Sequence, residues 1–142
     1  MKSYTDLEQS KKLTEILPLE SADMFLAMNG TIPVMAKYID DGYVTADETA
    51  IPCWSLAALL DLLPSEFTTV GKYATTTYEI KIRKYKFAND VDIYQIAYGN
   101  YKFYEDGNSS WKDMINTGQK EELIDAAFEM ICWLKENNPY KE

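Results

Sequence analysis

The sequence of 142 residues contains no histidine. This absence excludes Ser-His-Asp and Cys-His catalysis, every zinc site with a histidine ligand, and the most common general base near neutral pH. There are two cysteines, Cys53 and Cys132, so an all-thiolate zinc site cannot form within one chain either. Both lie in apolar segments, which favours free buried thiols over a disulfide. We therefore expect no metal site and no other cofactor.

Long apolar runs and glycine-rich loops are also missing. No run of 18 apolar residues is present, so we expect no transmembrane helix. The first residues, MKSYTDLEQSKKL, lack the apolar core of a secretory leader, which favours a cytoplasmic location. The six glycines are scattered and form no phosphate-binding loop.

Positive charge is scarce, since 14 lysine and arginine residues face 23 acidic residues and the net charge is −9. Such a chain repels phosphate backbones, so a nucleic-acid partner is not expected. The charge would suit a basic partner or a decoy that imitates DNA, although a solvated acidic surface is the simpler interpretation. With 46% hydrophobic residues the composition is that of a folded protein, and we expect one domain over residues 1–142.

Three segments have helical patterning. Residues 5–17 begin with Thr5 and Glu8 in the spacing of a capping box. Residues 54–63, within IPCWSLAALLDLLP, are apolar on nearly every side, so we expect a central helix that is buried all round. Residues 119–137 have apolar side chains at helical spacing and predict the clearest helix.

Two segments alternate like strands. Residues 33–51 predict a hairpin that turns at Asp41-Gly42. Residues 73–104 contain seven of the 11 tyrosines and predict a longer hairpin, in which the apolar alternation changes parity at Gly99 and indicates a β-bulge. Together these segments predict an α+β domain with an antiparallel sheet of about three to five strands and about three helices, one of them central and apolar.

Two motifs match known ligand-binding patterns only in part. The stretch KYIDDGYVTADE, residues 37–48, places Gly42 and Glu48 as an EF-hand calcium loop does, yet Lys37 and Ile39 occupy ligand positions, so a hairpin without calcium is favoured. The stretch KIRKYKF, residues 81–87, could hold a single-stranded nucleic acid, but its lysines also suit a solvated edge strand, which we favour. Neither these motifs nor any pair of carboxylates provides a catalytic residue.

Aromatic residues give the candidate partner surface. We expect residues 105–118 to form a polar loop around Trp111, which either folds back on the core or anchors a partner. Tyrosines of the long hairpin suit both a half-buried sheet and a binding surface. The candidate partner surface consists of Tyr85, Tyr94, Tyr98, Tyr101 and Trp111.

Three blocks, TDLEQSKKLTEILPLESADM, IPCWSLAALLDLLP and IDAAFEMICWLKEN, resemble the hallmark segments of a family of small uncharacterised proteins. This family is common in gut Bacteroidales and in their phages and mobile elements. It has no assigned activity and no assigned catalytic residues, so the resemblance transfers no residue role. It implies a cytoplasmic accessory protein carried by a mobile element.

These observations favour a non-enzymatic module that binds a protein partner and could also form a homo-oligomer. One alternative is an acidic DNA mimic of the anti-restriction type, which would require carboxylates spaced along one face like phosphates. A second is a small enzyme with carboxylate or tyrosine acid–base chemistry, which would require polar groups that converge in a pocket. We expect no membrane partner.

Overall fold

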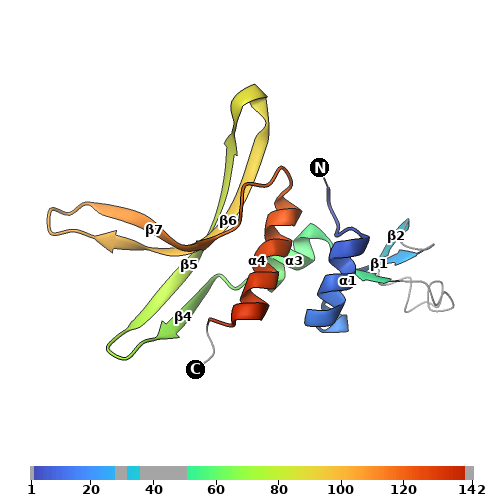
Figure 1. Cartoon of the computed structure of the whole chain (residues 1–142), viewed down its shortest axis with the longest axis horizontal. Helices are drawn as coiled ribbons and strands as arrows, with labels where there is room; N and C mark the ends of the chain where they lie inside the picture. The colour runs from blue at the N-terminus through green and yellow to red at the C-terminus, as the bar shows by residue number, and fades with distance from the viewer. Residues whose placement is uncertain (1, 28–31, 36–50, 140–142) are drawn as a thin grey trace. The chain divides into compact units, whose positions relative to one another are not determined.

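The computed structural model describes residues 2–27, 32–35 and 51–139, and the chain divides into two compact units, Met1–Leu62 and Leu63–Glu142 (Figure 1). Within these ranges there are two antiparallel sheets and three α-helices, which confirms the predicted α+β class. None of these helices has the length and apolar character needed to cross a membrane. The single domain expected from the sequence stays a prediction.

The first unit is built, in chain order, from α1 (Leu7–Ile16), η1 (Leu19–Ser21), β1 (Met24–Ala27), β2 (Ile32–Met35), β3 (Ile51–Cys53) and α3 (Leu56–Leu62). Its sheet has the order β2-β1-β3, and β1 pairs antiparallel with both neighbours. The sequence predicted that residues 33–51 form a hairpin. The described ends of that segment, β2 and the start of β3, lie on either side of β1 and do not pair with each other. Its predicted turn at Asp41-Gly42 and the EF-hand-like stretch lie outside the described residues.

Helix α1 begins at a capping box, one residue later than predicted. The side chain of Asp6 accepts a hydrogen bond from the N–H of Gln9 (2.8 Å), and the side chain of Gln9 accepts one from the N–H of Asp6 (3.2 Å). Thr5, the predicted cap, is fully buried, and its N–H donates to the carbonyl of Trp54 (2.9 Å). The predicted capping pair of Thr5 and Glu8 is therefore wrong, because Thr5 joins the N-terminal segment to the core.

Helix α3 is shorter than the predicted helix of residues 54–63. Trp54 is fully buried but lies before the helix, and Leu59 is the buried residue within it. Ala57 and Leu62 are exposed. The expected burial on every side is therefore wrong, because Trp54 packs from the segment before α3 and this short helix has only one buried side.

Side-chain hydrogen bonds fix the start of α3. The hydroxyl of Ser55 accepts a hydrogen bond from the N–H of Ala58 (3.1 Å), as an N-cap does. Ser55 also donates to Asp23 from its N–H (2.8 Å) and its hydroxyl (2.5 Å). The indole of Trp54 donates to the hydroxyl of Ser21 (3.0 Å) in η1. These bonds join β3, η1 and α3 around one polar corner of the first unit.

The second unit is built from β4 (Glu66–Val70), β5 (Thr75–Lys86), η2 (Ala88–Asp90), β6 (Asp92–Phe103), β7 (Ser109–Asn116) and α4 (Leu123–Asn137). The strands form one antiparallel sheet in chain order, and α4 packs against β6. The polar loop expected over residues 105–118 is wrong, because most of it is strand β7. Polar side chains on a partly solvated hairpin make that strand resemble a loop in sequence.

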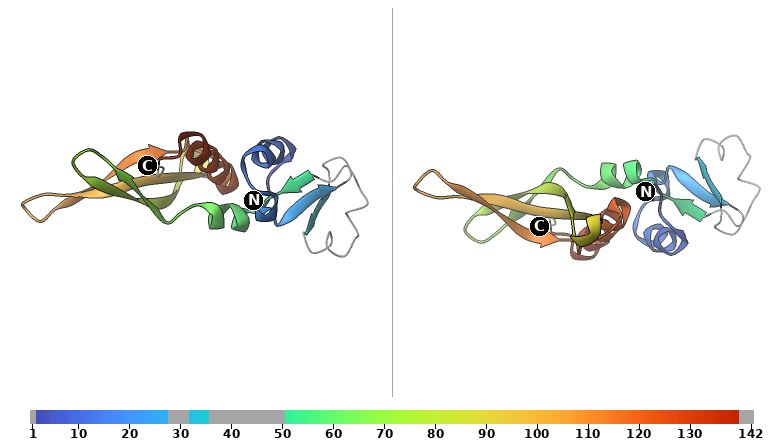
Figure 2. Two further views of the ribbon diagram at one scale, coloured as in Figure 1. Left: turned by 90° about the horizontal axis from the view of Figure 1, so that it is seen from below. Right: turned by 90° about the horizontal axis from the view of Figure 1, so that it is seen from above.

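The four strands are staggered, so each pair overlaps over only part of its length. β4 pairs with β5 as far as Glu79, and β6 pairs with β5 from that residue onward. By these pairings a single row, Glu66, Glu79, Gly99 and Asp113, crosses all four strands. The three hairpins of this sheet point in different directions (Figure 1), and Figure 2 shows how strongly they twist.

The register between β6 and β7 shifts at Gly99, which confirms the predicted bulge. Tyr98 pairs with Ile115 and Gly99 pairs with Asp113, so the extra residue is Met114. The bulge therefore adds its residue to β7, although the signal that revealed it lies in β6.

Helix α4 begins at Leu123, later than predicted, and ends where Asn138 adopts a left-handed conformation (φ 41°). Much of the predicted apolar face is buried, including Ile124, Ala127, Ile131 and Leu134. This helix and β6 therefore provide much of the core of the second unit.

Candidate partner-binding surface

The strand register assigns the side chains of the second sheet to two faces. Directly paired residues in neighbouring strands point to the same face. Tyr98 pairs with Ile80 and defines what we call the inner face, whereas Ala97 pairs with Lys81 on the outer face. Every second residue follows the same rule along each strand, except across the bulge in β7, where Asp113 lies on the outer face and Ile115 on the inner face.

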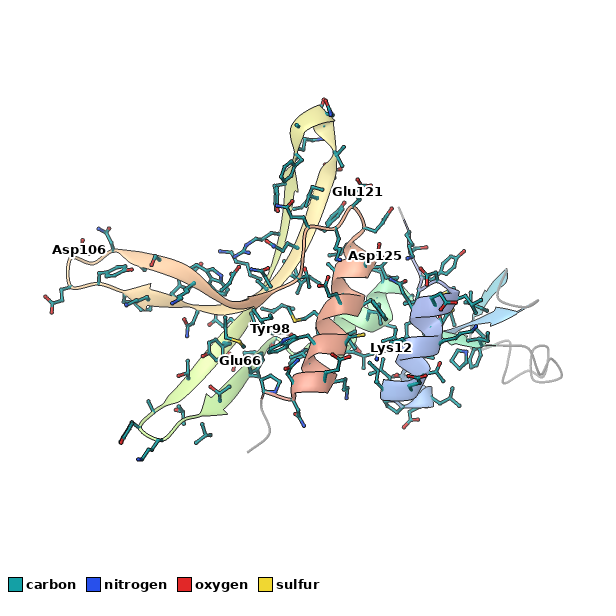
Figure 3. The ribbon with its side chains drawn as sticks, viewed as in Figure 1. Lys12, Glu66, Tyr98, Asp106, Glu121 and Asp125 are labelled. Atoms are coloured by element: carbon teal, nitrogen blue, oxygen red, sulfur yellow. The ribbon has the colours of Figure 1, made fainter. Side chains whose placement is uncertain are left out.

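Two of the predicted surface tyrosines are buried on the inner face. Tyr98 has no exposed area, its hydroxyl donates to the carbonyl of Pro64 (2.6 Å), and its ring lies 5.0 Å from that of Phe67. Tyr94 is also buried. Figure 3 shows Tyr98 at the base of the hairpins, far from the tip marked by Asp106. Placing Tyr94 and Tyr98 on a partner surface is therefore wrong, because both fill the core.

Trp111 lies at the centre of a cluster on the outer face. Its ring meets the edge of Tyr101, with centroids 5.2 Å apart and an interplanar angle of 77°. The ammonium group of Lys81 lies 4.7 Å from the Trp111 ring and 5.8 Å from that of Tyr101. Strands β5, β6 and β7 thus each contribute one side chain to a contact that no single segment could form.

Asp113 fixes the orientation of the Trp111 ring. Its carboxylate accepts two hydrogen bonds from Arg83 (2.6 and 2.8 Å), one from the indole of Trp111 (2.5 Å) and one from the amide of Asn116 (3.1 Å). The bonds from Arg83 contribute most, and with those from Trp111 and Asn116 they lower the pKa of Asp113 to about 2, against a smaller opposing effect of burial. The carboxylate is therefore charged at neutral pH and holds Arg83 and Trp111 in place. We call Lys81, Arg83, Tyr101, Trp111 and Asp113 the Trp111 cluster.

Gly99 provides the space that this cluster needs. A Cβ atom at this position would lie 2.2 Å from the carbonyl oxygen of Lys112 and 2.9 Å from Cζ2 of Trp111. The absence of a side chain therefore lets β7 and the indole approach the backbone of β6.

Exposed aromatic side chains extend from the cluster toward the hairpin tip. Tyr101 is 48% exposed and Phe103 is 78% exposed, and their ring centroids lie 6.4 Å apart. Tyr85 is half-buried and lies 6.1 Å from the exposed ring of Phe87, toward the other end of β5. The structure therefore joins Tyr101 and Trp111 of the predicted surface and leaves Tyr85 apart.

Sequence reasoning missed Lys81, Phe103 and Asp113 as members of this surface. Asp113 follows Trp111 by two residues, which would have placed both side chains on one face if the segment had been recognised as a strand. The contact of Lys81 with Trp111 had no sequence signal, because it depends on the pairing of three strands.

Two hollows open on the described part of the chain. One, of about 330 Å³, lies at the bulge and is lined by Tyr78, Asn100, Lys112, Asp113 and Met114. The other, of about 530 Å³ in the first unit, is lined by three acids and by Ser21, Ala57, Ala58 and Leu62. Across the described part of the chain, no group of three or more acidic or cysteine side chains could hold a metal ion.

No family model matches this sequence, and neither a curated protein nor a solved structure is significantly similar to it. The resemblance to the Bacteroidales family therefore stays a prediction.

Proposed function

We propose that this chain is a non-enzymatic protein-interaction module that binds its partner through the outer face of the β6–β7 hairpin. The observation that supports this proposal is a row of two exposed rings, Tyr101 and Phe103. They lie next to the Trp111 side chain, which Asp113 and Gly99 hold in one orientation. The Trp111 ring would lose little conformational entropy on binding, because its hydrogen bond to Asp113 already fixes its orientation.

The residue types of the Trp111 cluster support this proposal. Tryptophan, tyrosine and arginine dominate the residues whose truncation weakens protein interfaces most. All three occur together here as Trp111, Tyr101 and Arg83. The arginine is paired with Asp113, whereas the ammonium group of Lys81, 4.7 Å from the Trp111 ring, is a charge that a partner would have to pair or desolvate.

The remaining parts of the proposal rest on the sequence. The resemblance to the Bacteroidales family implies a cytoplasmic location and an origin in a phage or mobile element. Neither the DNA-mimic hypothesis nor the enzyme hypothesis gains a specific observation from the described residues. On β5, for example, Glu79 is followed by Lys81, Arg83, Lys84 and Lys86, which does not suit a phosphate-like row of acids.

The test is a comparison of two variants in a pull-down from Bacteroidales lysate with mass spectrometry. The test variant, Tyr101→Ala with Phe103→Ala, removes the exposed rings of the β6–β7 hairpin. The control, Val70→Ala with Tyr73→Ala, removes apolar groups at the β4–β5 hairpin that are even more exposed. We expect the wild type and the control to retain the same protein and the test variant to lose it.

Two results would contradict the proposal. One is equal retention by the test and control variants, with both shown to be folded by circular dichroism. The other is a wild-type protein that is strictly monomeric by light scattering and retains nothing from the lysate.

A further inference from the structure

Strand β5 extends beyond β4 and leaves an open edge. β4 pairs with β5 only as far as Glu79, so no described strand covers this side of β5 afterwards. The N–H of Ile80 donates to the carbonyl of Ser65 (2.9 Å), which shows that even-numbered residues direct their backbone groups to this edge. The N–H and C=O groups of Ile82 and Lys84 therefore point to a side where no described backbone group meets them.

This edge carries concentrated positive charge in an acidic protein. The part of β5 beyond Glu79 contains no acid and four cations, Lys81, Arg83, Lys84 and Lys86. The chain has a net charge of −9, so everything outside these four residues sums to −13 (−9 − 4). The exposed Lys84 and Lys86 side chains share a single carboxylate, that of Asp92, at 3.9 and 3.4 Å. One carboxylate neutralises only one of them, so the edge stays positive.

An exposed apolar side chain lies between these charges. Ile82 is 47% exposed and shares the inner face with Lys84 and Lys86, because all three are even-numbered residues of β5. An added strand would cover Ile82 with one side chain and place two others opposite the lysines. The best match is an extended segment in which alternate residues are acidic, acidic and apolar, in the order that places them opposite Lys86, Lys84 and Ile82.

We propose that the open edge of β5 binds an extended acidic segment of a partner protein as an added β-strand. Main-chain hydrogen bonds to Ile82 and Lys84 would supply affinity, and the lysines would select negative charge. A second copy of β5 is a poor occupant, because its lysines would face like charges across the new pair. This inference goes beyond the proposed function, since it concerns the edge of β5 and not the rings of the β6–β7 hairpin.

The probe is a synthetic heptapeptide with threonine at alternate residues, Thr-Glu-Thr-Glu-Thr-Val-Thr, blocked at both ends and carrying a fluorophore. In an antiparallel pair its two glutamates and its valine share one face, opposite Lys86, Lys84 and Ile82. Fluorescence anisotropy measures its binding to the full chain, and hydrogen exchange followed by NMR measures protection of individual amides. We expect binding that weakens with added salt, together with slower exchange of the Ile82 and Lys84 amides. A second peptide, N-methylated at alternate residues, keeps the charge but loses the main-chain donors, and we expect it not to bind.

Two charge-reversed variants separate a local effect from general attraction. Lys84→Glu with Lys86→Glu alters the edge, whereas Lys72→Glu with Lys102→Glu makes the same change at exposed lysines elsewhere in the sheet. Both variants have a net charge of −13 (−9 − 4). We expect the edge variant to bind the peptide about tenfold more weakly or worse, and the control to bind almost as the wild type does.

The inference is overturned if the alternating peptide does not bind, if the Ile82 and Lys84 amides gain no protection, or if the N-methylated peptide binds equally well. Equal weakening in the two charge-reversed variants would also overturn it, since that reports only the net charge. The variant with Tyr101→Ala and Phe103→Ala should bind the peptide normally. Peptide binding thus tests the β5 edge alone, whereas the pull-down tests the surface of the β6–β7 hairpin, so the two proposals can fail independently.

Discussion

The indole of Trp111 lies against the backbone of Gly99, so close that a Cβ atom on the glycine would stand 2.9 Å from Cζ2 of the ring. The two residues belong to neighbouring strands that shift register at this point. Gly99 also belongs to the row of paired residues that crosses all four strands. The position of the candidate surface thus depends on a residue without a side chain.

Replacing Gly99 with alanine is expected to destabilise the second unit. The added methyl group would meet the carbonyl oxygen of Lys112 at 2.2 Å, and backbone atoms cannot move aside as a flexible side chain can. We expect a loss of about 1–3 kcal/mol or more in the free energy of unfolding, measured by urea denaturation. Tryptophan fluorescence of the folded variant should also change, because the Trp111 ring is displaced.

Gly118→Ala is the matched control for this prediction. The nearest atoms to a Cβ at Gly118 belong to the flexible side chain of Lys120, at 3.9 Å, so the added methyl group fits. We expect this variant to unfold within about 0.5 kcal/mol of the wild type. Equal stability of the Gly99→Ala and Gly118→Ala variants would show that the close packing at the bulge is wrong.

Asp113 should make the stability of the protein sensitive to acid. Its pKa in the folded protein is about 2, below the usual value of about 3.9 in an unfolded chain. A lowered folded pKa means that the stabilisation is fully present above the unfolded value and is lost as the pH falls through the folded value. We therefore expect the contribution of Asp113 to disappear between about pH 4 and pH 2, as followed by urea denaturation at a series of pH values.

Asp113→Asn tests this assignment. Near neutral pH the variant should be less stable than the wild type by about 1.5–3 kcal/mol, a typical value for hydrogen bonds to a charged group. The difference should narrow as the pH falls toward 2, because the wild type then loses the same charge. Trp111→Phe removes only one of the donors to Asp113. The difference in stability between this variant and the wild type should therefore change less as the pH falls. A constant gap between wild type and Asp113→Asn at all pH values would contradict the prediction.

The two thiols should differ in reactivity. Cys53 is fully buried, and desolvation, followed by the charge of Asp23, raises the pKa of its thiol to about 12. The thiolate is the reactive species, so Cys53 should resist a disulfide reagent in the folded protein at about pH 8. Cys132 is only partly buried. We expect the Cys132→Ser variant to be labelled only after urea is added, whereas the Cys53→Ser variant should be labelled in its folded state.

Fast labelling of folded Cys132→Ser would show that Cys53 is accessible. The comparison needs both single variants, because the wild type has two thiols and labelling of one could be mistaken for the other. Near-ultraviolet circular dichroism of each variant checks that the serine has not loosened the core.

Local sequence patterns predicted much of the secondary structure. The apolar spacing of α4, the helical pattern of α1 and the long β5–β6 hairpin were each visible in a short stretch, because helix and strand periods are properties of neighbouring residues. The capping pair of α1 was predicted one residue too early. The parity change at Gly99 even located the bulge. The patterns missed three strands, β1, β4 and β7. In β7 the exposed polar residues Ser109, Lys112 and Asn116 look like a loop until a neighbouring strand pairs with them.

The sequence by itself determined the α+β class, the main helices and the absence of histidine chemistry, since these depend on composition and on residues close in the chain. Only the tertiary structure decided which aromatic residues face outward. Tyr94 and Tyr98 are buried while Tyr101 is exposed, although all three belong to β6. The physical reason is that Tyr94 and Tyr98 lie on the inner face of the sheet, whereas Tyr101 lies on the outer face. There it meets Trp111 through a strand register set by residues far apart in the sequence.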